Sequence, residues 1–424
     1  MQSVSAFFLQ MTTELLRKPD PILTWNLRQL YWDVFWFGIL AGSTIAFQAV
    51  YAARLGASGF QIGLLSAGPA VINLIFTLPS GRWLEGKSLV KVSFRSAIWQ
   101  RMGYVCLVAL PWLFGSPDGQ VWGLIWITLI MAVAGTVLAI SFNALFAEVL
   151  PTEWRAHAVG RRNVLLAVSI TIATLVSGQI LDRVIFPYNY QIVFLIGAIG
   201  AMLSSFHIGR IRKASAMSLP ELRTEAAADE VKHRIKRNSL LRLDLLTGPF
   251  GIFMFAYLAF YTFQYFPVPL FPLAYVERMN LTDGMIGAGT AMFYGTMMLA
   301  SFRLNYFSTR FGHHKVLVVS AALFPIFPLL LGLGKGAEWF YLACLLGGGI
   351  NAMLSGAIIN RLMDRVPADD RPAHMAIHNL ALNLGILAGA LLGAASGDLL
   401  GLQPALFLGA GLRFLAGGLF LLWG

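Results

Sequence analysis

Residues 121–155 read VWGLIWITLIMAVAGTVLAISFNALFAEVLPTEWR, and this stretch decides the class of fold. It contains no charged residue from Val121 to Ala147, and the first charge is Glu148. The hydrocarbon core of a bilayer is about 30 Å thick, so a helix of about 20 apolar residues crosses it. The stretch is therefore predicted to be a membrane-spanning helix that ends at a charged boundary.

Eleven further stretches share this character, so we expect an all-α polytopic membrane protein with twelve transmembrane helices. The chain of 424 residues is 57% hydrophobic and 12% charged, about half the charge of a soluble domain. This composition excludes a disordered chain, a coiled coil, a disulfide scaffold and an ordinary soluble enzyme. The predicted spans are centred near Ile39, Ala70, Cys106, Ala134, Thr171, Ile199, Ala259, Gly295, Leu323, Gly349, Gly389 and Gly411.

The net charge of +11 is explained by the positions of the cations. Of the 31 Lys and Arg residues, 25 fall before span 1 or in the connections 2–3, 4–5, 6–7, 8–9 and 10–11, and four fall on the other side. Because cytoplasmic loops are enriched in Lys and Arg, both termini are expected in the cytoplasm. The expected location is the inner or plasma membrane of a bacterium, with membrane lipids as neighbours and no nucleic-acid partner.

The spacing of the spans predicts four segments. Residues 1–24 form an N-terminal cytoplasmic segment, either an amphipathic helix at the membrane surface or a frayed tail. Residues 25–209 form a bundle of six helices. Residues 210–243 form a polar, basic cytoplasmic linker, and residues 244–424 form the second six-helix bundle.

The two bundles resemble each other in sequence as parallel pseudo-repeats. Pro151, Arg155 and Asn163 recur as Pro367, Arg371 and Asn379, each 216 residues later. Asn143, Leu145 and Val149 recur as Asn360, Leu362 and Val366, each 217 residues later. Two parallel halves of six helices are one of the repeat patterns of secondary transporters.

Short motifs at the cytoplasmic ends of the spans strengthen this interpretation. The 2–3 connection reads Gly81-Arg82-Trp83-Leu84-Glu85-Gly86-Lys87, with a second copy at Thr309-Arg310-Phe311-Gly312-His313-His314-Lys315. The 4–5 connection reads Glu148-Val149-Leu150-Pro151-Thr152-Glu153-Trp154-Arg155, and residues 364–371 match it in the second half. With twelve spans, a parallel repeat and a basic central loop, the chain resembles the major facilitator superfamily, whose fold is two six-helix bundles.

That resemblance implies a gate of paired charges on the cytoplasmic side. Such clusters pair across helices when the inner side closes and separate when it opens. Topology charge and helix capping are the alternative explanation for the same residues. The candidates are Glu85, Lys87, Glu148 and Arg155 in the first half, and Arg310, Asp364, Arg365 and Arg371 in the second.

The resemblance also implies a substrate cavity between the halves, lined by spans 1, 4, 7 and 10. Polar and aromatic side chains at helical spacing in these spans suit an amphipathic organic ligand. Helix packing is the alternative explanation of the same pattern. The candidates are Phe37, Thr44 and Gln48 in span 1, Asn143 in span 4, Tyr257, Tyr261, Gln264 and Tyr265 in span 7, and Asn351 and Ser355 in span 10.

Three charges fall inside apolar spans, where a charge is costly and points to a function. Asp33, in span 1, is a candidate proton-coupling site or a structural counter-ion for a nearby cation. Arg101, in span 3, and Arg413, in span 12, require a partner or a polar cavity, and either could anchor an anionic group.

Together these features predict a secondary transporter that moves a small apolar or amphipathic molecule by rocker-switch alternating access. Proton-coupled export is the leading form, with protons as the coupling ion and a monomer as the working unit. A uniporter or importer of a polar metabolite, a lipid or lysolipid transporter, and a non-transporting scaffold are the alternatives. No nucleotide-binding or hydrolase motif appears in the sequence, so we expect no catalytic residue, no metal and no cofactor.

Overall fold

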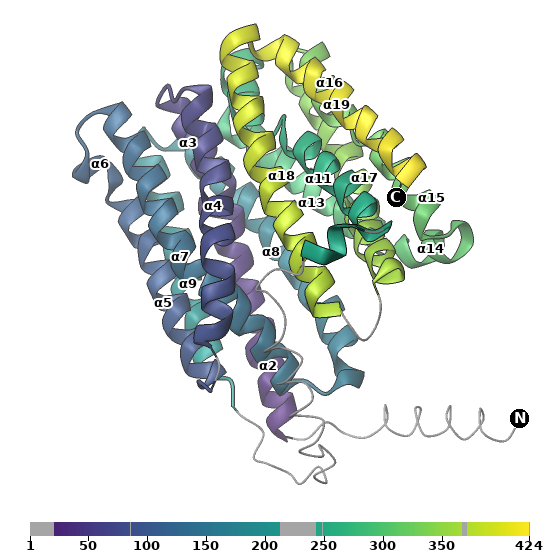
Figure 1. Cartoon of the computed structure of the whole chain (residues 1–424). Helices are drawn as coiled ribbons and strands as arrows, with labels where there is room; N and C mark the ends of the chain where they lie inside the picture. Colours follow the sequence, from purple (N-terminus) through teal and green to yellow (C-terminus); the bar gives the residue numbers. More distant parts are fainter. Residues whose placement is uncertain (1–20, 85, 213–242, 248, 367–370, 424) are drawn as a thin grey trace, which may run out of the picture.

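The computed structural model describes residues 21–84, 86–212, 243–247, 249–366 and 371–423. Within these residues every regular element is a helix (Figure 1). Each of the twelve predicted span centres lies inside a helix, which confirms the all-α fold. The predicted amphipathic segment before residue 21 lies outside the described residues, as does most of the predicted linker.

The first half of the chain forms spans 1 to 6. Span 1 is one continuous rod of three segments, namely α2 (Pro21–Leu40), the π-helical turn η1 (Ala41–Ile45) and α3 (Ala46–Arg54). The other spans are α4 (Gly59–Trp83), α5 (Leu89–Val108) with the short α6 (Leu110–Leu113), α7 (Pro117–Val149), α8 (Thr152–Arg183) and α9 (Tyr188–Gly209).

The second half forms spans 7 to 12. Span 7 is broken, because α11 (Pro249–Tyr265) is followed by turns, by α12 (Leu270–Leu273) and by the π-helical η3 (Ala274–Arg278). The 3-10 turn η2 (Leu243–Thr247) precedes it. The remaining helices are α13 (Asp283–Ser301), α14 (Leu304–Phe311), α15 (His313–Leu323), α16 (Ile326–Leu333), α17 (Ala337–Arg365), α18 (Arg371–Leu400) and α19 (Leu402–Trp423).

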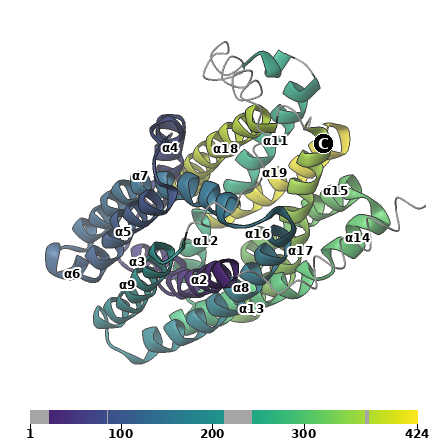
Figure 2. The ribbon, with the colours of Figure 1, turned by 90° about the horizontal axis from the view of Figure 1, so that it is seen from below.

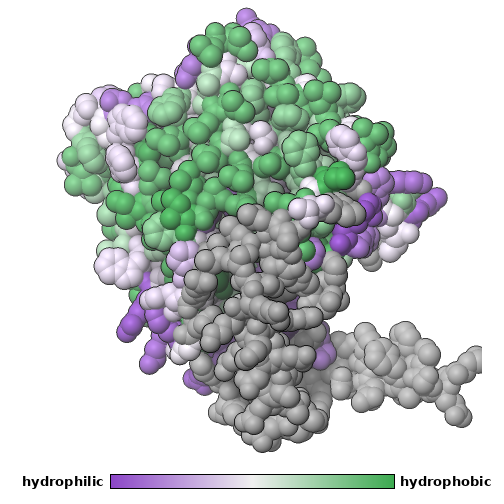
Figure 3. All heavy atoms as spheres, in the orientation of Figure 1, coloured by the Kyte–Doolittle hydropathy of each residue, from purple (hydrophilic) through white to green (hydrophobic). Residues whose placement is uncertain are grey.

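The surface of the bundle is that of an integral membrane protein. Ten helical stretches of the described chain are long and apolar enough to cross a membrane. The other two predicted spans are α5, which carries three cations, and α13. Helix α5 packs on α7 and α9 in the first half, and α13 packs on α17 of the second half and on α8 of the first. Hydrophobic residues cover most of the face seen in Figure 3, and hydrophilic residues gather toward its ends.

Local sequence signals set several of the helix boundaries. Ser116 precedes α7 and accepts a hydrogen bond from the backbone N–H of Gly119 at 3.1 Å, and Thr282 caps α13 in the same way. Such caps satisfy N–H groups that have no partner in the first turn of a helix. Gly401, with φ of 85°, provides the left-handed turn between α18 and α19.

The two halves meet mainly through α8 with α13 and α4 with α18 (Figure 2), and more narrowly through α3 with α12 and η3. The α8–α13 contact is close because glycines line it on both sides. A Cβ atom added at Gly178 would lie 3.1 Å from the Asp283 carbonyl oxygen. One added at Gly287 would lie 2.6 Å from the Thr174 carbonyl oxygen, so any side chain there pushes the halves apart.

Inside the second half, α18 packs on α11 through a ridge of glycines spaced four residues apart. A Cβ atom at Gly389 would lie 2.3 Å from the Thr262 carbonyl oxygen, and Gly385 meets Tyr261 at 2.5 Å. The ridge therefore serves close packing between neighbouring helices of one half.

Candidate functional site

A buried ion pair lies inside the first half, near the end that carries the 2–3 and 4–5 connections, which we call the basic end. Asp33, on α2, is 3% exposed, and its Oδ2 lies 3.4 Å from Nη2 of Arg162 on α8. Ser204, on α9, donates its hydroxyl to Asp33 Oδ1 at 2.5 Å. Three helices of one half therefore hold this carboxylate.

Two guanidinium groups surround the Asp33 carboxylate. Arg101, on α5, is 3% exposed, donates from Nη1 to the Ser205 hydroxyl at 2.8 Å, and interacts electrostatically with Asp33. The Arg162 guanidinium also lies over the rings of Phe142 and Phe146, at 4.9 and 5.6 Å from their centroids. The aromatic faces and the carboxylate stabilise the buried Arg162. Nε of Arg101 and Nη1 of Arg162 are buried with no hydrogen-bond partner in the described structure.

Span 1 does not present its predicted polar stripe on a single helix face. The π-helical turn at residues 41–45 adds one residue to the helix and rotates the residues after it by about 100°. Thr44 is fully buried, and Phe37 packs against the main hydrophobic core. Gln48 is half-buried. The side chains before and after the turn therefore face different neighbours.

A cavity of about 300 Å³ lies inside the second half, between the broken span 7 and spans 8, 9, 10 and 12. Four residues predicted from the sequence line it: Gln264 and Tyr265 from α11, Asn351 from α17 and Arg413 from α19. Its walls are mainly aromatic, and the Gln264 Oε1 atom is buried with no partner in the described structure. The remaining lining residues are Val268, Phe271, Tyr275, Thr290, Phe293, Phe324, Phe327, Phe340 and Cys344.

Arg413 is positioned by the break in span 7. Pro267 and Pro269 interrupt the helix, and the Val268 N–H bonds to the Tyr265 carbonyl rather than to that of Gln264. The Arg413 guanidinium donates to the freed Gln264 carbonyl, with Nε at 3.1 Å. It also lies 4.4 Å from the centroid of the Phe324 ring. Arg413 therefore satisfies a carbonyl that the helix break leaves without a backbone partner, and it forms the polar part of the cavity wall.

Tyr257 and Tyr261 lie in the hydrophobic core of the second half and do not line this cavity. Tyr257 is fully buried between Phe253 and Phe420, with ring centroids 4.7 and 5.0 Å away. The Tyr261 hydroxyl is 2.8 Å from Nε2 of His378 on α18. Both tyrosines therefore join α11 to its neighbours.

The remaining polar candidates of spans 4 and 10 do not line this cavity. Asn143 on α7 and Ser355 on α17 are both exposed. A polar contact between the halves that the sequence did not predict involves Asn73 on α4. Its Oδ1 accepts a bond from Thr136 at 2.6 Å, and its Nδ2 lies 3.4 Å from Oδ1 of Asn383 on α18.

At the end of the bundle opposite the basic end, which we call the far end, an ion pair and hydrogen bonds connect the two halves. Nη2 and Nε of Arg54, at the end of α3, lie 3.1 and 3.3 Å from Oδ1 of Asp283, at the start of α13. Tyr190, on α9, donates its hydroxyl to Asp283 Oδ2 at 2.9 Å. Asp182, at the end of α8, accepts bonds from the Thr282 hydroxyl and the Gly284 N–H at 2.8 and 2.9 Å. These contacts, which we call the far-end latch, join the two halves.

In the first half, two of the predicted gate residues, Arg155 and Lys87, make local contacts. Arg155 donates to the carbonyls of Leu150 and Ala147 at 3.0 and 2.7 Å, which caps the end of α7. The Lys87 ammonium lies 3.2 Å from the centroid of the Trp83 ring. Glu148 is exposed, and Glu85 lies outside the described residues.

In the second half, one predicted gate residue bonds locally and another contacts a neighbouring helix. Arg310 Nη1 donates to the Tyr306 hydroxyl at 2.5 Å, four residues earlier on α14. Arg365 is exposed at the end of α17, and its guanidinium lies 5.6 Å from the centroid of the Phe253 ring. Asp364 is also exposed, and the side chain of Arg371 lies outside the described part of the chain. A paired gate at the basic end therefore stays a prediction.

Comparison with curated proteins gives a partial match to one transporter. The chain is 25% identical over 122 residues to Multidrug resistance protein 2 of Bacillus subtilis (strain 168). The match covers 29% of this chain and 30% of that relative. It therefore spans less than a third of the relative's length.

The fold has counterparts among solved structures. A bacterial homologue of the iron transporter ferroportin, in its inward-facing state, superimposes with a TM-score of 0.70 at 14% identity, covering 95% of this chain and 98% of that one. A mutant of the nucleoside transporter NupG gives 0.68 at 12% identity, covering 94% and 99%. A D-xylose–proton symporter gives 0.65 at 15% identity, covering 94% and 96%. The family model of the Major Facilitator Superfamily matches residues 34–268 and 253–424, so the chain belongs to this superfamily of membrane transporters.

Proposed function

We propose that the protein carries a small amphipathic organic molecule across the membrane by alternating access between residues 25–209 and residues 244–424. The observation that carries this proposal is the far-end latch. Charged and hydrogen-bonded groups such as Arg54 and Asp283 can separate and re-form, as alternating access requires. The latched far end corresponds to a state that opens at the basic end.

The distribution of cations supports an orientation with the basic end and both termini in the cytoplasm. In that orientation the latched state faces inward. The partial match to a multidrug resistance protein supports export as the direction of transport. The whole activity of that relative is not carried over, because the match covers 30% of its length.

The cavity in the second half is the proposed substrate site. Aromatic rings such as Phe293 and Phe340 suit an apolar body, and Gln264 Oε1 offers an acceptor for a hydrogen-bond donor of the ligand. Arg413 disfavours a cationic group at the same place. A neutral or anionic aromatic molecule with a polar head is therefore the substrate class that these residues favour.

Asp33 is the proposed proton-coupling residue. Protonation would remove the negative charge that faces Arg162 and Arg101, so the helices that carry these groups would repel one another. A fixed counter-ion role for Asp33 is the alternative, and the close ion pair with Arg162 supports it as well. Transport under an imposed pH gradient, compared between wild type and Asp33→Asn, separates the two, because an equal response in both would exclude Asp33 as the coupling site.

A ligand panel tests the substrate site. The purified protein is melted with drugs, sugars and lipids, and neutral or anionic aromatic compounds are expected to raise the melting temperature. In Asn351→Leu the same compounds should lose this effect, because Asn351 lines the cavity. Asn360→Leu, the same change on the same helix but outside the cavity, is the matched control. Equal ligand responses in the two variants would place the substrate elsewhere.

A further inference from the structure

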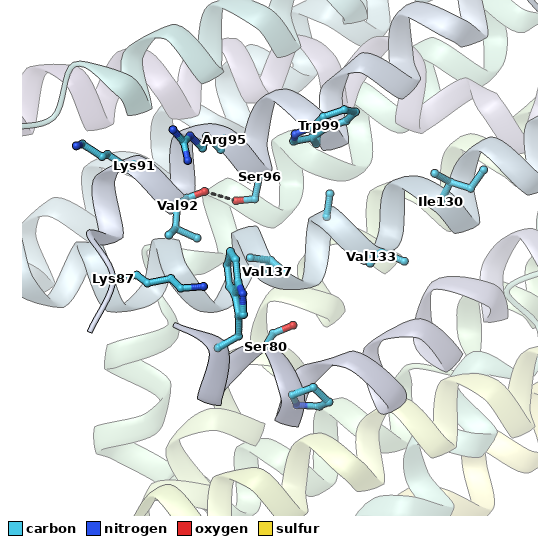
Figure 4. A pocket seen from close by; sticks show the side chains of 13 residues that line it. Ser80, Lys87, Lys91, Val92, Arg95, Ser96, Trp99, Ile130, Val133 and Val137 are labelled. Atoms are coloured by element: carbon cyan, nitrogen blue, oxygen red, sulfur yellow. Dashed lines mark hydrogen bonds between the residues drawn. The ribbon is translucent and has the colours of Figure 1, made fainter. Parts of the chain in front are cut away.

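A large groove runs along the outer surface of the first half, near the basic end (Figure 4). It measures about 1020 Å³ and is separate from the cavity in the second half. Its floor is α7, which contributes Ile130, Val133, Ala134 and Val137. Its walls are the end of α4 and the first turns of α5, which both pack on α7.

Three cations stand at the mouth of this groove, namely Lys87, Lys91 and Arg95, and all three are exposed. Lys91 and Arg95 are four residues apart on α5, so they share a helix face with Trp99 one turn further along. None of the described lining residues is acidic. Residues 85–95 hold one acid, Glu85, which lies outside the described residues, so this stretch has an excess of positive charge.

Beyond the cations the groove is apolar. Trp99 is 75% exposed and Ile130 is 70% exposed, although both are large hydrophobic side chains. In a membrane-spanning bundle, lipid hydrocarbon covers such side chains. From Arg95 to Trp99 the α5 helix rises by about 6 Å, so the groove runs from a charged mouth toward the middle of the membrane.

We propose that this groove binds an anionic phospholipid of the leaflet at the basic end. The phosphate lies among Lys87, Lys91 and Arg95, and the acyl chains lie along Val133, Val137 and Ile130. Charge complementarity selects the lipid class, because three cations at the mouth attract a net negative headgroup more strongly than a zwitterionic one. The apolar floor accounts for a diacyl lipid rather than a free phosphate ion.

The position of the groove connects the bound lipid to the contact between the halves. Helix α4 forms one wall of the groove and also packs against α18 of the other half. The proposal needs only that the chain lies in a membrane, so it stands apart from the identity of the transported molecule.

Native mass spectrometry of the full-length protein tests the site, with phosphatidylglycerol and phosphatidylcholine of identical acyl chains as probes. Wild type should retain one phosphatidylglycerol in preference to phosphatidylcholine, and Lys91→Gln/Arg95→Gln should reduce that preference by about tenfold. Lys315→Gln/Arg303→Gln, which removes two exposed cations of the second half, is the matched control and should keep the preference. Inorganic phosphate should not displace the lipid.

A second measurement reports on the acyl chains. Phosphatidylglycerol brominated on its acyl chains should quench tryptophan fluorescence in wild type, and Trp99→Phe should remove part of that quenching. Val133→Trp, which fills the floor, should lower lipid retention without removing a charge. Equal retention of the two lipids by wild type, or an unchanged preference in Lys91→Gln/Arg95→Gln, would overturn the proposal. Displacement by inorganic phosphate would also overturn it, since the site would then bind an ion.

Discussion

Replacing Asp283 by asparagine is expected to weaken the far-end latch and to favour the state that is open at the far end. The substitution keeps the size of the side chain but removes the charge that faces Arg54. It also replaces the carboxylate that accepts a hydrogen bond from the Tyr190 hydroxyl at 2.9 Å. Contacts within each half are left in place, so the change acts on the equilibrium between states.

The size of the effect follows from the burial of the pair. A hydrogen bond to a charged group is worth about 1.5–3 kcal/mol when buried. The Asp283 side chain is 9% exposed and that of Arg54 is 28% exposed, so water screens part of their interaction. We therefore expect a loss of about 1.5–3 kcal/mol for all bonds to Asp283 together, which changes the ratio of the two states by about 10- to 100-fold.

The alkylation rate of a cysteine placed at Thr174 measures this change. Thr174 is fully buried on α8, where its carbonyl faces Gly287 of the other half. In a background without Cys106 and Cys344, a maleimide that cannot cross the membrane is added from the far side. When opening is rare, the rate is proportional to the open fraction, so Asp283→Asn should raise it by about 10- to 100-fold.

Asp118→Asn is the matched control for this measurement. Asp118 accepts a hydrogen bond from Gln61 at 2.9 Å, and both residues belong to the first half. It is the same substitution close to the same end, but it breaks no contact between the halves. An alkylation rate that rises equally in both variants, or in neither, would refute the reasoning, because the latch would then not control opening.

Three further substitutions test other parts of the structure. Asp33→Asn should destabilise the protein by about 3–5 kcal/mol, because it leaves Arg162 buried without its counter-ion. The added change Arg162→Gln should restore part of the melting temperature. A melting temperature that Asp33→Asn leaves unchanged would contradict the ion pair. Gly287→Val should raise the alkylation rate described above, because its side chain would meet the opposing helix; an unaltered rate would mean that the helices are not in contact. Tyr261→Phe should lower the free energy of unfolding by about 1 kcal/mol, because the hydrogen bond to His378 is lost, and should leave ligand binding unchanged. Weaker binding with unchanged stability would instead place Tyr261 in the substrate site.

The fold is predictable because it depends on average hydropathy and on charge position, which are local properties of the sequence. The span around Ala134 requires only an uncharged stretch longer than the bilayer thickness. The span around Cys106 is the harder case, since α5 carries Lys91, Arg95 and Arg101. Its flanking apolar residues and the topology of the chain still indicate a helix there.

The candidate site is less completely predictable, because it depends on contacts between distant residues. Arg162 is, in the sequence, one more cation near a loop, and its pairing with Asp33 joins residues 129 apart. Arg54 and Asp283 belong to different halves, so neither residue signals the latch by itself. The sequence predicted a cavity between the halves, whereas the cavity that Gln264 and Tyr265 line lies inside the second half, and their neighbour Tyr261 is in the core.

Helix irregularities explain the rest of the difference. The polar stripe predicted for span 1 assumes an unbroken α-helix, whereas residues 41–45 form a π-helical turn. The sequence AGSTI gives no recognised signal for this turn. The prolines at 267 and 269 do signal a break in span 7. Their consequence, a free carbonyl that Arg413 satisfies, depends on the position of α19.

Counterflow in proteoliposomes tests alternating-access transport most directly. Vesicles are loaded with an unlabelled compound that raises the melting temperature of the protein, and the labelled compound is added outside at low concentration. A carrier exposes one site to the two sides in turn, so the labelled compound should accumulate transiently above its outside concentration, and it should do so less in Asn351→Leu. Binding without any such accumulation above protein-free vesicles would contradict the account.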